Sequence, residues 1–97
     1  MTKLTGKQVR FLRGLGHHLQ PVVMIGREEL SDRVLAAVEK ALDDHELIKI
    51  KLQEGCLMDR SDAATSLAQQ SGAAVAQILG RTILLFRPSD KNLITLP

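Results

Sequence analysis

The chain has 97 residues, of which 44% are hydrophobic and 25% are charged, and its formal net charge is +2. This length predicts one domain spanning residues 1–97, and no apolar run approaches the roughly 20 residues of a membrane-spanning helix. One cysteine excludes an internal disulfide and fits a cytoplasmic protein, while two phenylalanines as the only aromatic residues argue against single-strand binding on an aromatic platform.

The charges are segregated along the sequence. Residues 1–27 contain five basic side chains and no acidic one, residues 28–62 have a net charge of −5, and residues 63–97 have a net charge of +2. Such segregation predicts a basic patch on a nearly neutral body, and therefore a polyanionic partner.

The first predicted element is a helix that begins after Thr5. Thr5 and Gln8 fit a capping box, and apolar residues then recur at helical spacing. A second face of this helix carries basic residues and a glycine at the same spacing: Lys3, Lys7, Arg10, Gly14 and His17, with Arg13 at its edge. This pattern is typical of a solvated helix face or of a phosphate-binding face. Because no acidic residue interrupts the basic face, the two interpretations have equal weight.

The stretch from Pro21 to Leu35 predicts a buried strand over residues 22–25, a turn that begins at Gly26, and a second helix from about residue 32 to 43. Glycine can adopt backbone conformations that are closed to other residues. Arg27 and the free backbone N–H groups of this loop would favour an anionic partner, although any strand–turn–helix connection has these features.

The second helix is mostly acidic on its exposed side, so we do not expect it to contact nucleic acid. The second strand, residues 47–53, alternates apolar residues with Lys49, Lys51 and Gln53. This alternation predicts a strand with one buried face and one basic face.

A third helix is expected to begin at a cap formed by Asp59 or Ser61 and to end at Gly72. Two strands follow, over residues 73–79 and 82–87, and the tail from 89 to 97 is expected to be surface-bound or frayed. The pair Gly80-Arg81 between the strands fits a two-residue type II′ hairpin turn.

The resulting order, α-β-α-β-α-β-β, predicts an α/β fold in one compact domain. Two βαβ crossovers would make the first three strands parallel, and the hairpin would make the fourth antiparallel. We therefore expect a mixed four-stranded sheet with packed helices.

The sequence lacks the motifs of a catalytic, nucleotide or metal site. It contains neither GxGxxG nor GxxxxGK[ST], and His17, His18 and His45 with Cys56 do not have zinc-site spacing. Cys56 has no recognisable base motif beside it. We expect no metal, no cofactor and no enzymatic activity.

Three stretches together resemble a known family: LTGKQVRFLRGLGHHLQPVVMIG, LSDRVLAAVEKALDDHELIKIKL and GRTILLFRP. Over about residues 4–96 the chain is similar to stand-alone bacterial CRM domains of the YhbY type, where CRM stands for chloroplast RNA splicing and ribosome maturation. The resemblance implies a fold like the C-terminal domain of translation initiation factor three. It also implies RNA binding and association with precursors of the large ribosomal subunit.

The family carries a GxxG loop between its first strand and second helix, comparable to the RNA-clamping loop of KH domains. Gly26 matches the first glycine, but Glu29 occupies the second position, so the loop reads GREE. A glutamate repels phosphate and keeps the backbone further from it. Arg27 partly compensates for this charge. Because of the departure at Glu29, we expect the basic first helix to contribute more of the RNA contact than the loop does.

The sequence therefore predicts a monomeric RNA-binding accessory protein that holds structured ribosomal RNA by phosphate contacts and shape. We expect the basic face of the first helix to lie close to Arg27. An alternative is a protein-interaction module that docks a ribosomal protein or assembly factor through the acidic second helix. An enzyme or small-ligand domain ranks third, because the sequence contains no motif of such a site. The candidate RNA contacts are Lys3, Lys7, Arg10, Arg13, His17, Gly26, Arg27, Lys49, Lys51 and Arg81.

Overall fold

The computed structural model describes residues 3–97, and over this range three helices and four strands follow one another in the predicted order. Each strand begins and ends within one residue of its predicted bounds. The elements are α1 (Gly6–Gly16), β1 (Pro21–Ile25), α2 (Asp32–His45), β2 (Leu47–Leu52), α3 (Arg60–Ser71), β3 (Ala74–Leu79) and β4 (Thr82–Phe86).

Side chains cap the N-terminus of each of these helices. Thr5 and Gln8 form the predicted capping box on α1, through bonds of 3.0 and 3.1 Å. Ser31 caps α2, and Asp59 rather than Ser61 caps α3. These caps satisfy backbone N–H groups that have no partner inside the helix, so they fix where each helix begins.

The sheet has the strand order β1-β2-β4-β3. β1 pairs parallel with β2, whereas β4 pairs antiparallel with both β2 and β3, so the first three strands run in the same direction as predicted. The hairpin between β3 and β4 turns at Gly80, whose φ of 59° fits the first central position of a type II′ turn. The position of β4 between β2 and β3 was not predicted.

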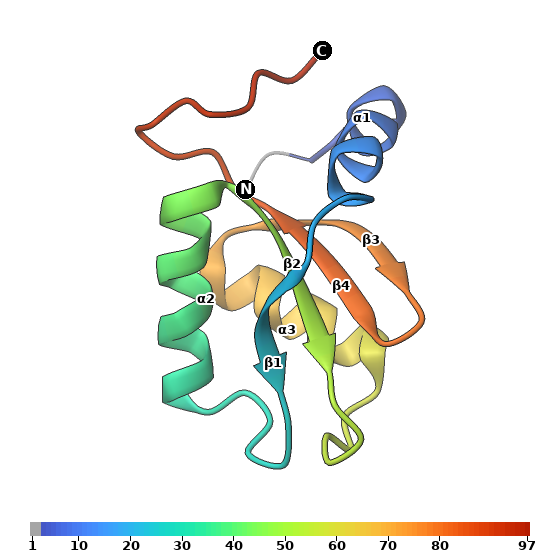
Figure 1. Ribbon diagram of the computed structural model, residues 1–97, viewed down its shortest axis with the longest axis vertical. Helices are drawn as coiled ribbons and strands as arrows, with labels where there is room; N and C mark the ends of the chain where they lie inside the picture. The colour runs from blue at the N-terminus through green and yellow to red at the C-terminus, as the bar shows by residue number, and fades with distance from the viewer. Residues whose placement is uncertain (1–2) are drawn as a thin grey trace.

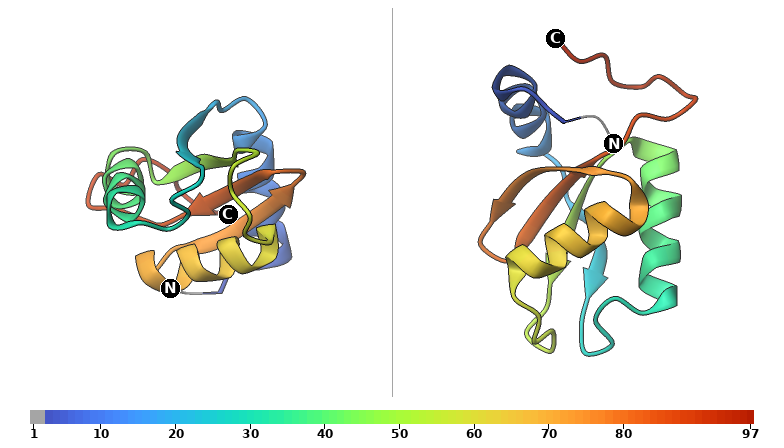
Figure 2. Two further views of the ribbon diagram at one scale, coloured as in Figure 1. Left: turned by 90° about the horizontal axis from the view of Figure 1, so that it is seen from below. Right: turned by 180° about the vertical axis from the view of Figure 1, so that it is seen from behind.

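Helices cover the two faces of the sheet unequally (Figures 1 and 2). α2 and α3 pack on one face over the larger core cluster, which includes Ile25, Ile50 and Leu85. α1 crosses only one end of the other face, where Leu12 and Phe86 belong to a smaller cluster. No helix of the described residues 3–97 covers the rest of this second face.

The tail after β4 is surface-bound, not frayed. The buried carboxylate of Glu46 accepts hydrogen bonds from the backbone N and the Oγ of Ser89, at 2.9 and 2.6 Å, and from the backbone N of Ile94 at 2.9 Å. Burial raises the pKa of Glu46, but hydrogen bonds to its charged form outweigh that effect and lower the pKa. Ile94 and Leu96 also pack against the smaller cluster.

Candidate nucleic-acid interface

The basic side of α1 meets a lysine of β2 at one hollow of about 460 Å³. We call this the basic hollow; the lining residues come from α1 and its C-cap residue, from β2 and from β3, and none of them is acidic. They are Arg10, Arg13, Gly14, His17, Lys49, Gln77 and Leu79. Four of the predicted contact residues, Arg10, Arg13, His17 and Lys49, are thus brought together from segments far apart in the sequence.

Close packing of α1 on β4 produces this arrangement. Leu12 and Gly16 turn inward and are buried. A Cβ on Gly16 would lie 2.7 Å from both methyl carbons of Leu84, so any larger residue would force Leu84 or the helix to move. Because helical spacing puts Arg10 and His17 on another side of α1, that side is placed beside Lys49.

Gly14 has a different environment from Gly16. No other element of the described chain comes within 4 Å of the position that a Cβ on Gly14 would occupy. An exposed glycine inside a helix costs about 1 kcal/mol relative to alanine, and packing does not require one here. Its effect is to leave the helix backbone accessible in the basic hollow, where a phosphate could approach closely.

The other lysines of the predicted set lie at different distances from this hollow. Lys51 is exposed and follows Lys49 by two residues on β2, so it extends the positive charge over the open part of the same sheet face. Lys7 is exposed on α1, one turn before Arg10. Lys3 instead lines a separate hollow with Gly72 and lies outside the basic hollow.

The loop that carries Arg27 lies at the opposite end of the sheet from α1 (Figure 1). The expectation that the basic face of α1 lies close to Arg27 is therefore wrong. The reason is the length of β1, which separates them: five extended residues span about 17 Å.

The backbone of this loop also differs from expectation. Between β1 and α2 the positive φ belongs to Glu29, at 55°, and not to Gly26. The backbone N of Glu29 donates to the carbonyl oxygen of Gly26 over 3.0 Å, which closes a turn. A non-glycine residue is strained in this left-handed conformation. The position where the resembling family has its second glycine is thus one whose geometry suits glycine.

Arg81 has a structural role that the sequence did not indicate. Its guanidinium donates to the carbonyl oxygens of Leu52 at 3.0 Å, Gln53 at 2.7 Å and Cys56 at 3.4 Å. These bonds hold the connector between β2 and α3 against the hairpin. An arginine directly after a hairpin glycine gives no local signal of such partners.

The acidic side of α2 is largely engaged within the molecule. Arg87 donates to Glu39 at 2.7 Å and to Asp43 at 2.8 Å. Lys40 and Lys91 contact Asp44, and hydrogen bonds from these two lysines lower the pKa of that carboxyl group. These ion pairs reduce the charge that α2 offers to a basic protein partner.

The residues that the structure describes provide neither a cluster of metal ligands nor a helix that could cross a membrane. Cys56 is buried. Within residues 3–97 no group of three or more His, Cys, Asp or Glu residues could hold a metal ion. The helices of this range are also too short and too polar to span a bilayer.

The sequence model of the CRS1 / YhbY (CRM) domain matches residues 4–87. A protein of Haemophilus influenzae named "RNA-binding protein" is 42% identical over 97 residues, which is 100% of this chain and 98% of that protein. "Probable RNA-binding protein YqeI" of Bacillus subtilis is 38% identical over 92% of this chain and 93% of its own length. The solution structure of SAV1595 from Staphylococcus aureus has a TM-score of 0.84 and 31% identity, and the match covers 98% of this chain and 100% of that one.

Proposed function

Since this chain belongs to the CRS1 / YhbY (CRM) domain family, we propose that it binds structured RNA by the phosphate backbone. The observation that carries the proposal is the basic hollow, in which Arg10 and Arg13 of α1 and the C-cap residue His17 meet Lys49 of β2 and no acidic residue intervenes. Arginine and lysine side chains at this spacing suit phosphate oxygens. Relatives of similar length that are named as RNA-binding proteins support the same conclusion.

The family resemblance supports a more specific partner, namely ribosomal RNA in a precursor of the large ribosomal subunit. In this proposal the protein is a monomeric, cytoplasmic assembly accessory without catalytic activity. Phosphate contacts would come mainly from α1 and from Lys49 and Lys51. The loop with Gly26 and Arg27 would form a separate contact at the far end of the sheet, which only an RNA long enough to follow the sheet would reach.

The test is to remove two positive charges from α1 and, in a control, two from α2. Arg10→Gln with Arg13→Gln should weaken binding to precursor ribosomal RNA and lower the slope of log affinity against log salt by about two phosphate contacts. Arg33→Gln with Lys40→Gln removes equal charge from exposed positions outside the hollow and should leave the slope unchanged.

Titrations at two salt concentrations measure both quantities, and thermal unfolding shows that each variant is folded. Unaltered RNA binding by the folded α1 variant would move the interface away from the basic hollow. RNA binding that does not respond to salt would contradict phosphate recognition altogether and favour the protein-interaction alternative.

A further inference from the structure

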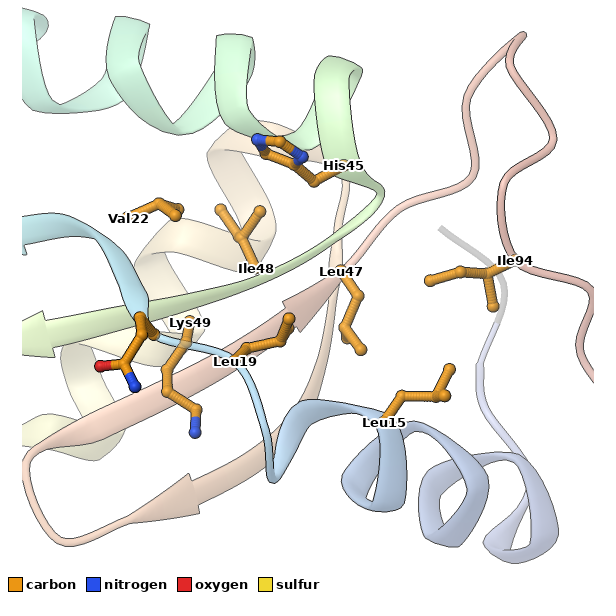
Figure 3. A pocket seen from close by; sticks show the side chains of 9 residues that line it. Leu15, Leu19, Val22, His45, Leu47, Ile48, Lys49 and Ile94 are labelled. Carbon is orange, nitrogen blue, oxygen red and sulfur yellow. The ribbon is translucent and has the colours of Figure 1, made fainter.

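A second hollow of about 480 Å³ lies beside the first and shares Lys49 with it. We call it the apolar hollow. Its lining residues come from α1, the connector to β1, β1, the end of α2, β2 and the C-terminal tail. Figure 3 shows Leu15, Leu47 and Ile94 pointing toward one another across it. Its polar groups are Lys49 and, on the same lining, Gln20 and His45.

Packing inside the domain leaves part of this wall uncovered. Leu15 is 40% exposed and Val22 is 52% exposed, although both are large and apolar. A contiguous exposed apolar surface next to polar groups is typical of a binding site. No acidic residue occurs among the nine that line the hollow.

We propose that the apolar hollow receives an unpaired base of the RNA strand whose phosphates lie in the basic hollow; the inference rests on the proposed function. Because Lys49 lines both hollows, a phosphate held by its ammonium group in the basic hollow would leave the attached nucleoside next to the apolar hollow. A base has two apolar faces, which aliphatic walls can contact. Its hydrogen-bonding edge would meet the side chains of Gln20 and His45.

Charge favours a nucleotide over a protein segment as the occupant. The apolar hollow is continuous with a cationic surface and contains Lys49, so it suits a ligand that is apolar in one part and anionic in the next. A base with its phosphate has this character. Bases in a regular duplex stay stacked, so the hollow would select a bulge, loop or single strand.

The experiment compares two anionic probes that differ in whether they carry bases. One is a single-stranded oligoribonucleotide of mixed sequence, and the other is inorganic polyphosphate. Leu15→Ser and Val22→Thr make the wall polar at exposed positions. Leu57→Ser is the matched control, because Leu57 is 88% exposed and lies in the connector at the far end of the sheet.

We expect the double variant Leu15→Ser, Val22→Thr to weaken oligoribonucleotide binding about fivefold, which is the lower end of what a base stacked on an aromatic side chain contributes. Polyphosphate binding should not change, and Leu57→Ser should change neither affinity. The thermal midpoint shows whether each variant is folded. If the Leu15→Ser variant does not fold, the single variant Val22→Thr is tested instead, and we expect a smaller loss of oligoribonucleotide affinity.

Two outcomes would overturn the inference. If the folded double variant binds the oligoribonucleotide as tightly as the wild type does, the hollow does not receive a base, and a protein segment becomes the favoured occupant. An equal loss for both probes would show that the wall affects phosphate binding and not a base. Failure of the unchanged protein to bind precursor ribosomal RNA would instead overturn the proposed function, on which the inference rests.

Discussion

Replacing Glu29 by glycine should stabilise the domain, because it removes a side chain from a backbone conformation that suits glycine. A left-handed residue with a side chain costs about 1–2 kcal/mol. Glycine offsets about 0.5–1 kcal/mol of this gain through its greater freedom in the unfolded chain. The turn bond from the backbone N at position 29 to the Gly26 carbonyl uses no side-chain atom and is kept. The net gain in the free energy of unfolding is therefore about 0.5–1 kcal/mol, or about 2–8 °C in thermal midpoint for a domain of this size.

Glu28→Gly is the matched control, because it removes the same charge from the same loop at a residue without a positive φ. It should lower stability by about 0.5–1 kcal/mol. Urea unfolding followed by circular dichroism measures both variants. Similar effects of the two substitutions, or a loss of stability in Glu29→Gly, would refute the argument from backbone conformation.

The same two variants test whether the loop contacts RNA. If it does, removing either negative charge should strengthen binding to precursor ribosomal RNA by about two- to fivefold. Arg27→Ala should weaken binding by a similar factor. Unchanged affinity in all three variants would leave α1 and its hollow as the interface.

Four further substitutions test the packing and the hydrogen bonds of the domain. Gly16→Ala should lower the free energy of unfolding by about 1–3 kcal/mol through overpacking, whereas Gly14→Ala should raise it by about 1 kcal/mol; equal effects in urea unfolding would contradict the packing of α1. Glu46→Gln should cost about 1–3 kcal/mol at pH 7 and increase hydrogen exchange at the Ile94 amide. Because the pKa of Glu46 is lowered on folding, its stabilising effect is complete above the ordinary carboxyl range and disappears as the pH falls through the folded value. As the pH falls, the free energy of unfolding should therefore decrease less in the variant than in the wild type. An equal decrease in both proteins would contradict this. Arg81→Gln should reduce stability by about 1–3 kcal/mol, because the carbonyl oxygens that Arg81 contacts lose their donors, and should leave the salt slope of RNA binding unchanged; a lower slope would instead indicate phosphate contact.

Local patterns were sufficient to predict the elements of this fold. The capping box at Thr5, the apolar alternation over residues 47–53 and the glycine at position 80 each act within a few residues, and each was confirmed. The insertion of β4 between β2 and β3 was missed, because strand order depends on how whole elements pack and not on any one segment.

The part of the candidate site that lies within one element could be predicted from the sequence. Helical spacing grouped Arg10 with His17, and the two line the same hollow. The contribution of Lys49 to that hollow depends on where α1 crosses the sheet, which no local pattern determines. The position of Arg27 could have been predicted from the length of β1 alone. The partners of Arg81 and Glu46 come from distant segments, so their roles required the structure.

The central place of β4 in the sheet has a consequence for biosynthesis. β4 is translated after the other three strands of the sheet. Within the described residues it is the only strand that pairs with β3, and without β4 the strand β2 pairs with β1 alone. The nascent chain therefore cannot add strands to the sheet in the order in which they emerge. Until residues 82–86 are available, apolar side chains of β2 and β3 lack their neighbours, and such intermediates are prone to aggregate. We expect chains arrested before residue 82 to be sensitive to proteases and chaperone-bound, and protection to appear abruptly once β4 has emerged.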